Sequence, residues 1–228
     1  MTDSPAVAVA DAPRRGRPRG SYAKTEARRK EILTAAFEVF AASGYRAGSL
    51  KDVADKVGLT QAGLLHHFPS KEALLEAVLT LRDEESVDRL GTADAKGMDL
   101  LRGLVELTRY NTTIPGLVSL YCILSAEATD PEHPAHEYFL RRYTWVRDTI
   151  SGAFAEVARL GRLRPGIVPL AATRQLIALM DGLQVQWLLD NDSVDMPAEV
   201  AAFLEAVTTG TFQAGARLSD SEVKDQNA

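Results

Sequence analysis

The chain has 228 residues, 46% of them hydrophobic and 25% charged, which is typical of a globular protein with one sizeable domain or two unequal ones. The single cysteine, Cys122, excludes an intramolecular disulfide, and no uncharged apolar run is long enough to span a membrane, so we expect a soluble cytoplasmic protein. The net charge of -5 is unevenly distributed, because residues 12–71 carry +7 and residues 72–228 carry -10, which favours a polyanionic partner for the N-terminal third.

Residues 1–22 are predicted to form a disordered tail. They are rich in Ala, Pro, Gly and Arg and have too few large apolar side chains to offset the entropy of ordering. The sequence RGRP at 15–18 matches the core of an AT-hook, in which arginines enter the narrow minor groove of A·T-rich DNA. Two interpretations stay open for Arg14, Arg15, Arg17 and Arg19, namely DNA contact and a solvated tail. The basic residues that follow belong to the same expected salt-dependent surface: Lys24, Arg28, Arg29 and Lys30.

A group of short helices is predicted next. Residues 24–42 have the apolar spacing of one helix face, and Ser43-Gly44 is expected to end that helix. Ser49 with Asp52 resembles a capping box that starts a second helix, which stops at residue 58. Thr60 can cap a third helix at 61–67, and Ser70 a fourth. Two short helices joined by residues 58–60 and supported by a longer one form a helix-turn-helix, whose second helix is short because it enters a DNA groove.

The remaining sequence shows only helical periodicity. Helices are predicted at 98–112, 117–128, about 134–160 and 169–190, followed by a last helix that ends near residue 215. The segment 169–190 is apolar on two sides and therefore needs two partners. Because no strand-like alternation is present, the predicted fold class is all-α, with about nine helices.

Neither an enzyme nor a metal site is predicted. The chain has no G-x-S-x-G, G-x-x-x-x-G-K-[ST], H-E-x-x-H or G-x-G-x-x-G motif, so we expect no catalytic residues and no cofactor. His133 and His136 lie among acidic residues and could bind zinc. Pro134 favours instead a helix start, at which acidic side chains complement the helix dipole.

The sequence of the predicted helix-turn-helix region resembles that of the TetR family of one-component bacterial transcriptional regulators. The resemblance runs from about residue 28 to 78 and rests on Ile32, Ala36, Phe40, Gly44-Tyr45, SLKDVA at 49–54, GLT at 58–60 and HFPSKEALL at 67–75. It is looser in the remainder, where 127–136 and 178–190 are similar to actinobacterial members. The family implies a homodimer built from the last two helices, about 169–190 and 197–215, which agrees with the doubly apolar segment.

The helix-turn-helix supplies the candidate DNA-binding residues. Gln61 opens the helix expected in the major groove, where its amide can pair bidentately with adenine. The resemblance places Lys51 near a guanine or a phosphate, and His66, His67 and Lys71 near phosphates. His67 could instead be a packing residue.

Four further positions have less direct expected roles at the DNA. Ser49 and Thr60 either make neutral contacts with DNA or serve only as helix caps. Ala62 can offer close approach or contact with a thymine methyl group. Leu65 stands where the family usually has a tyrosine that touches the DNA backbone, so either His66 substitutes for it or other contacts carry the affinity.

The resemblance also implies an effector pocket in residues 71–218, whose occupancy moves the fourth helix and changes the spacing of the two reading helices. The candidate lining residues are aromatic or polarizable side chains expected to face inward: Tyr110, Tyr121, Trp145, Met180, Gln184 and Trp187. Core or dimer packing is the alternative for each of them. The expected effector is an apolar or aromatic small molecule.

These expectations favour a sequence-specific DNA-binding regulator, most simply a homodimeric repressor that a ligand releases from a palindromic operator. The alternatives are a constitutive or architectural DNA-binding protein without an effector, and an activator of the same fold. The predicted domains are the tail at 1–22, a DNA-binding domain of three helices at 23–70, an effector-binding and dimerisation domain at 71–218, and a disordered tail at 219–228.

Overall fold

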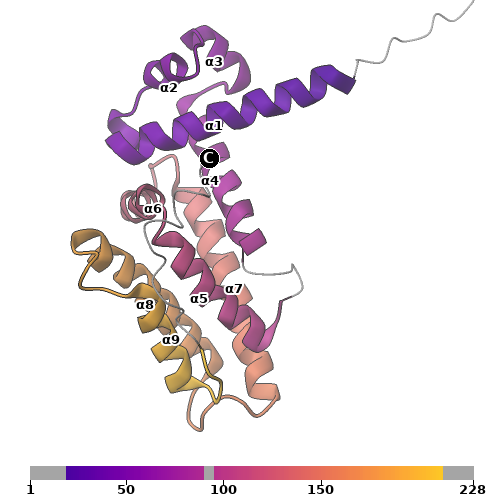
Figure 1. Cartoon of the computed structure of the whole chain (residues 1–228), viewed down its shortest axis with the longest axis vertical. Coiled ribbons are helices and arrows are strands. Elements are labelled where there is room, and N and C mark those ends of the chain that lie inside the picture. The colour runs from indigo at the N-terminus through magenta and orange to yellow at the C-terminus, as the bar shows by residue number, and fades with distance from the viewer. Residues whose placement is uncertain (1–18, 90–94, 213–228) are drawn as a thin grey trace, which may run out of the picture.

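The computed structural model describes residues 19–89 and 95–212, and within them it contains nine α-helices and no strand (Figure 1). The all-α prediction is therefore confirmed. Helices α1–α3 form the head of the molecule (residues 19–67), α5–α9 form its body (residues 95–212), and α4 leads from one to the other. The helices are α1 (Arg19–Ala47), α2 (Leu50–Lys56), α3 (Gln61–His67), α4 (Lys71–Arg89), α5 (Gly97–Asn111), α6 (Pro115–Glu127), α7 (His136–Arg159), α8 (Pro169–Leu189) and α9 (Met196–Val207).

The two short helices of the head begin at their capping residues. Ser49 Oγ accepts a hydrogen bond from the Asp52 N–H (3.1 Å), and Asp52 Oδ2 accepts one from the Ser49 N–H (3.2 Å), which forms the predicted capping box of α2. Thr60 Oγ1 accepts the Gly63 N–H at 3.1 Å and starts α3. Between them Gly58 has φ 65°, a left-handed conformation that favours glycine, so the chain can turn tightly from α2 into α3.

Helix α1 is longer than the predicted helix at 24–42, since it begins at Arg19 and continues to Ala47. Gly44 interrupts it with φ 74° and ψ 163°, so the predicted helix end is a kink within a longer helical segment. After the kink, Tyr45 is buried against Phe40, with the two rings edge to face at 5.7 Å. The kink therefore brings an aromatic side chain into the core beneath the head.

Two arginines of α1 hold the C-terminal ends of α2 and α3. Arg28 Nη2 donates to the carbonyl of Val57, the C-cap of α2, at 2.7 Å. Arg29 Nη1 donates to the carbonyl of His67 at 3.3 Å, and its guanidinium lies 4.2 Å from the Phe68 ring centroid. Carbonyls at a helix C-terminus lack intrahelical partners and carry partial negative charge, so these cations stabilise the orientation of α2 and α3.

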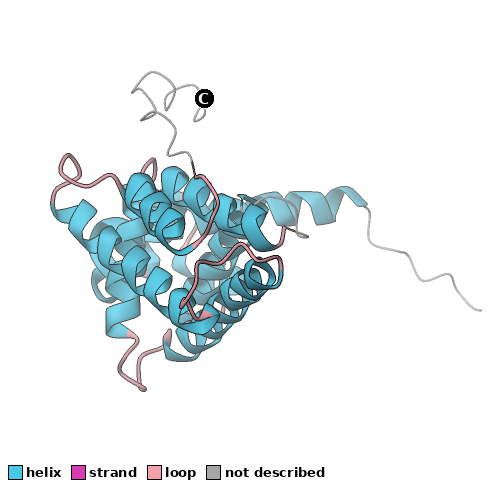
Figure 2. Cartoon of the chain, turned by 90° about the horizontal axis from the view of Figure 1, so that it is seen from below, coloured by secondary structure: helices cyan, strands magenta, loops and turns pink. Residues whose placement is uncertain are grey.

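The buried apolar side chains form two cores. The first joins the head and α4 to α6 and the start of α7, and includes Phe40, Phe68, Leu75, Leu124 and Phe139. The second is built mainly from α5, α7, α8 and α9. Figure 2, a view from below, shows the helices of the molecule packed side by side. Because α6 and α7 contribute to the first core, the head rests on the body through continuous apolar contact. The predicted domain boundary at 70–71 stays a prediction.

Helix α8 is apolar on two sides, but only one side is covered. Leu176, Leu183 and Trp187 lie in the second core, whereas Val185 is 49% and Leu189 83% exposed. Its neighbour α9 contributes Val200 and other apolar residues to the same core. A second side of α8 thus remains uncovered in the single chain. None of the described helices is both long and apolar enough to cross a bilayer.

The last helix is shorter than predicted, because α9 ends at Val207 rather than near residue 215. Thr208 is extended (φ -123°, ψ 174°), forms an antiparallel bridge with Leu163, and donates through Oγ1 to the Leu204 carbonyl at 2.8 Å. The Arg164 N–H donates to the Val207 carbonyl at 2.9 Å. The chain leaves the helix in order to pair with the α7–α8 loop, which local periodicity does not reveal. Residues 213–215 lie outside the described residues.

Replacing Arg28 by Met is expected to lower the free energy of unfolding by about 1–3 kcal/mol, because the charged hydrogen bond to the Val57 carbonyl is lost. Urea denaturation followed by circular dichroism measures the change. Lys30→Met, at an exposed position of the same helix, is the control and is expected to change stability by less than ~0.5 kcal/mol. Equal effects of the two substitutions would contradict the capping role of Arg28.

Candidate functional site

Helix α3 presents a small exposed face that carries the predicted base-reading residues. Gln61, Ala62, Leu65 and His66 are exposed, whereas Leu64 is fully buried in the first core. Gln61 is the first residue of the helix, so its amide stands at the end that a helix-turn-helix delivers to base edges. The structure therefore brings these four residues together on one accessible surface.

The predicted polar residues around α2 already have partners within the head. Ser49 and Thr60 act as caps, as described above. Lys51 Nζ lies 2.6 Å from Asp55 Oδ2, and this hydrogen bond raises the pKa of Lys51. Its side chain is 72% exposed, and an exposed pair of this kind is worth little. The Lys51 ammonium can therefore exchange Asp55 for a DNA acceptor at small cost.

The predicted phosphate-contact residues His67 and Lys71 lie at the junction of α3, α1 and α4. His67 is half-buried, and Lys71 Nζ donates to the Arg46 carbonyl at 3.2 Å. The Lys71 ammonium lies 4.5 Å from the centroid of Tyr45, whose pKa is raised to about 12 by burial and by the nearby Glu72 carboxylate. Lys71 thus ties the start of α4 to the end of α1, a structural role beside the predicted phosphate contact.

The predicted minor-groove residues fall mostly outside the part of the chain that is described. Arg14, Arg15 and Arg17 lie outside the described residues. Arg19 is the first residue of α1, so the helix begins within the predicted tail. The interpretation of RGRP as an AT-hook core stays a prediction.

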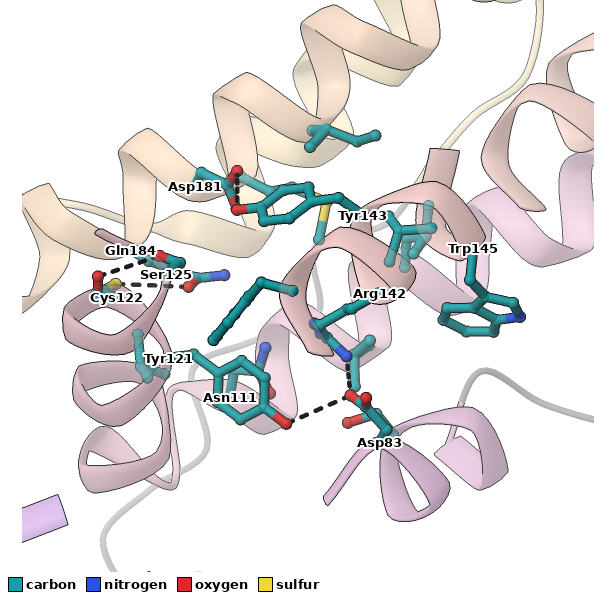
Figure 3. A pocket seen from close by; sticks show the side chains of 18 of the residues that line it. Asp83, Asn111, Tyr121, Cys122, Ser125, Arg142, Tyr143, Trp145, Asp181 and Gln184 are labelled. Carbon is teal, nitrogen blue, oxygen red and sulfur yellow. Dashed lines mark hydrogen bonds and ion pairs between the residues drawn. The ribbon is translucent and has the colours of Figure 1, made fainter. Parts of the chain in front are cut away.

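A cavity of about 600 Å³ lies in the body, enclosed by α4, α5, α6, α7 and α8 (Figure 3). Four of the predicted effector-binding residues line it, namely Tyr121, Trp145, Met180 and Gln184. Tyr110 is not among its lining residues, and Trp187 is buried in the second core. Trp187 faces the core because it follows Leu183 by one helical turn on the buried side of α8.

A polar cluster joins α4 to one wall of the cavity (Figure 3). The Asp83 carboxylate of α4 forms an ion pair with Arg142 of α7 and accepts a hydrogen bond from the Tyr138 hydroxyl. The Tyr121 hydroxyl lies 3.4 Å from Asp83 Oδ1 and 3.1 Å from the Leu79 carbonyl, so it can donate to either acceptor. The sequence did not indicate this cluster, since its members come from three helices far apart in the chain.

Burial sets the protonation of this cluster. It is the main cause of the raised pKa of Tyr138, with Tyr121 second, so the Tyr138 hydroxyl stays protonated and can donate to Asp83. Burial also lowers the pKa of Arg142 to about 10, which still leaves the guanidinium charged at neutral pH. Asp83 therefore faces a cation and two hydroxyl groups.

The opposite wall of the cavity carries weaker polar contacts. Tyr143 OH donates to Asp181 Oδ2 at 2.9 Å, and both residues are exposed at the rim. The Cys122 thiol lies 3.7 Å from the amide oxygen of Gln184, and burial raises the thiol pKa to about 11. Cys122 is therefore a neutral thiol at physiological pH and a weak donor.

The histidines at 133 and 136 have internal contacts. The His133 ring is buried, accepts the Ala135 N–H through Nδ1 at 3.1 Å and lies edge to face with Tyr45 at 5.8 Å. His136 Nδ1 lies 2.7 Å from the Ala128 carbonyl. Within residues 19–89 and 95–212, no group of three or more His, Cys, Asp or Glu side chains is placed to hold a metal ion.

Two family models match the chain. The model described as bacterial regulatory proteins of the tetR family matches residues 32–78, which span most of the head and the start of α4. The model described as the C-terminal part of BetI-type transcriptional repressors matches residues 125–213. The two matches together cover more than half of the chain and lie in the order expected from the fold.

Individual proteins are similar along most of their length. The HTH-type transcriptional regulator UidR of Escherichia coli is 24% identical over 181 residues, which cover 78% of this chain and 89% of UidR. A putative transcriptional regulator from Saccharomonospora viridis, solved with choline, is 25% identical with a TM-score of 0.66 and coverages of 79% and 96%. The SmeT–triclosan complex shares the fold with a TM-score of 0.70 at 22% identity, covering 85% of this chain and 98% of SmeT. Taken with the helix-turn-helix and the helical body, these matches show that the chain belongs to the TetR family of DNA-binding transcriptional regulators.

Proposed function

We propose that this regulator is a homodimeric repressor, acting in the cytoplasm, that leaves its operator when a small molecule occupies the cavity of the body. The observation that carries the proposal is that α4 contacts both the DNA-reading head and the cavity of the body. Its first residue, Lys71, is hydrogen-bonded to the end of α1, and Asp83, about three helical turns later, lines the cavity. A ligand that displaces α4 at Asp83 therefore moves the helix directly behind the DNA-reading head.

In the proposed complex, α3 lies in the major groove. Gln61 pairs with an adenine, and Lys51 contacts a guanine or a phosphate. The supporting side chains contact the backbone or approach the bases closely: Ser49, Thr60, Ala62, Leu65, His66, His67 and Lys71. The half-sites of a palindromic operator lie roughly 34–36 Å apart, so a shift of a few Å between the two heads is enough to lose the match.

The uncovered side of α8 supports dimerisation. Val185, Leu188 and Leu189 expose apolar surface on α8, with exposed fractions of 49%, 36% and 83%. Ala202 and Ala206 of the adjacent α9 are exposed and small, which permits close approach of a second helix pair. Two copies of α8 and α9 can thus bury this surface in a four-helix bundle. The second helix is α9 as observed, Met196–Val207, rather than the predicted 197–215.

The cavity supports control by a small molecule over the effector-free alternative. Its volume of about 600 Å³ falls within the range of small-molecule sites, and its lining is mainly apolar with a few polar groups. The S. viridis regulator and SmeT were each solved with a small molecule, choline and triclosan respectively. A transcriptional activator of the same fold is the remaining alternative, and it would differ only in where its operator lies relative to the promoter.

A footprint of the purified protein on the DNA flanking its own gene tests this proposal. At physiological salt we expect protection of an inverted repeat, and loss of that protection when extracts of the producing cell are added. Even coverage of A·T-rich DNA without a palindrome would favour an architectural protein. Protection that no extract releases would contradict the ligand-controlled part of the proposal.

Replacing Gln61 by Ala is expected to relax specificity at one base pair of each half-site by about 1–3 kcal/mol, because the bidentate amide contact is lost. Competition binding against operators with single base changes measures this loss. His66→Ala, on the same exposed face, is the control and should weaken binding to all operator sequences by the same factor. An unchanged base preference in Gln61→Ala would rule out the assigned base contact.

Replacing Leu188 by Asp is expected to raise the dimer dissociation constant by ~100-fold or more, because an unpaired carboxylate would be buried in the interface. Sedimentation equilibrium measures this constant. Leu140→Asp places the same charge on α7, at a position that is 52% exposed, and is expected to leave the dimer intact. Dissociation in neither variant would show that α8 does not form the interface.

A further inference from the structure

The cavity contains one cation at a position that can respond to a ligand. Arg142 is the only Lys or Arg among the described residues that line it, and the lining acids are Asp83 and Asp181. Most of the remaining lining consists of apolar and aromatic side chains, including Tyr121 and Phe139. A ligand in this cavity thus meets a largely apolar wall and a single guanidinium.

The guanidinium of Arg142 is held between α7, α6 and α4. Nη1 pairs with Asp83 Oδ1, and the guanidinium carbon lies 4.8 Å from the Tyr121 ring centroid. The side chain of Arg142 is 25% exposed, as is that of Asp83. A guanidinium carries five N–H donors in a planar fork, so one paired nitrogen leaves directional donors for a second acceptor.

The ion pair also lies between two hollows. Asp83, Arg142 and Trp145 line both the main cavity and an adjoining pocket of about 420 Å³ that includes Thr80 and Glu84 of α4. Figure 3 shows Arg142 directed at Asp83, with Trp145 on the same side of the cavity. A charged group at Arg142 would therefore stand at the partly open end, while an apolar body fills the interior.

We propose that the effector is an amphipathic anion, whose acidic group binds Arg142 in competition with Asp83 and whose apolar part occupies the cavity. This inference rests on the proposed ligand control and names the class of ligand. The Asp83–Arg142 ion pair is then the contact between α4 and α7 that the ligand breaks. Two carboxylates at one guanidinium repel each other in a poorly solvated site, so the incoming anion weakens the hold of Arg142 on α4. By thermodynamic linkage, operator binding lowers the affinity of the protein for the anion by the same factor by which the anion lowers its affinity for the operator.

A cationic effector fits the same residues less well. The Asp83 carboxylate already faces Arg142 and the Tyr138 hydroxyl, so a second cation at that point would be repelled by Arg142. Asp181 already accepts a hydrogen bond from Tyr143, and partial burial among its neighbours raises the pKa of its carboxyl group, which disfavours the charged form that a cation would bind. The arrangement of charges thus favours an anion within the cavity.

Head-group series with a constant apolar part test this inference on the full-length protein. Naphthylacetate, naphthylethanol and naphthylethylamine form one series, and decanoate, decanol and decylamine form a second. Isothermal titration calorimetry without DNA is expected to show the carboxylate binding about tenfold more tightly than the alcohol in at least one series. Tightest binding by the amine, equal binding by all three, or no carboxylate binding in either series would overturn the proposal.

Two variants separate anion recognition from general stability. Arg142→Gln is expected to abolish the preference for carboxylate over alcohol. Asp83→Asn keeps the shape of the side chain but removes the competing charge, so it should bind the carboxylate several-fold more tightly than the native protein does. The control is Glu76→Gln, at a residue that lines neither hollow. It breaks the exposed α4–α7 pair of Glu76 with Arg141 (3.1 Å), and it should change neither the preference for carboxylate over alcohol nor the affinity for the carboxylate.

The effect of the anion on DNA binding is measured separately by fluorescence anisotropy with the footprinted operator. The preferred carboxylate is expected to lower operator affinity in the native protein and to lower it much less in Asp83→Asn. If the ligand-free protein binds the operator but no carboxylate preference is found, the anion inference fails and the proposed repressor function stands. If the ligand-free protein binds no operator, the proposed function itself fails.

Discussion

The carboxylate of Asp83 attaches helix α4 to the body of the molecule. It pairs with Arg142 and accepts a hydrogen bond from Tyr138, both on α7, and it lies within reach of the Tyr121 hydroxyl of α6. A partly buried carboxylate is costly unless such partners surround it, so these partners together fix this part of α4 against α6 and α7, in addition to the apolar contacts of the first core. The same residues form part of the cavity lining, so any molecule that fills the cavity meets the attachment point of α4.

At its other end, α4 is fixed to the junction between head and body. Lys71 donates to the Arg46 carbonyl and lies over the Tyr45 ring, which in turn packs edge to face against His133 of the α6–α7 loop. Arg29 links α1 to the end of α3. We therefore expect the head to follow α4 as a unit, so that a displacement at Asp83 becomes a change in the position of α3.

Local structure in the head was accessible from the sequence because each helix boundary depends on neighbouring residues. The capping box of α2, the Thr60 cap of α3 and the glycine turn between them involve residues at most a few positions apart. The end of α9 was not accessible in this way, because Thr208 pairs with Leu163, which lies in the loop before α8. The C-terminal caps formed by Arg28 and Arg29 were missed for the same reason, since their partners lie about 30 and 40 residues away.

The candidate effector site was only partly predictable. Residue type and helical position placed Tyr121, Trp145, Met180 and Gln184 among residues that line the cavity, but the same reasoning could not separate Trp187, which lies on the core side of α8. Asp83 and Arg142 carry no local signal, because charged residues on a helix usually face solvent. Only the packing of α4 against α6 and α7 shows that these two charges meet.

The most direct test of α4 as the link between cavity and head is the distance between the two heads of the dimer. Spin labels at Ser43→Cys in a Cys122→Ser background, measured by double electron–electron resonance, report this distance without any ligand. Asp83→Asn, which weakens the attachment of α4, is expected to shift or broaden the distance distribution, whereas Glu76→Gln should leave it unchanged. An identical distribution in native protein and Asp83→Asn would contradict the role of Asp83 in positioning the head.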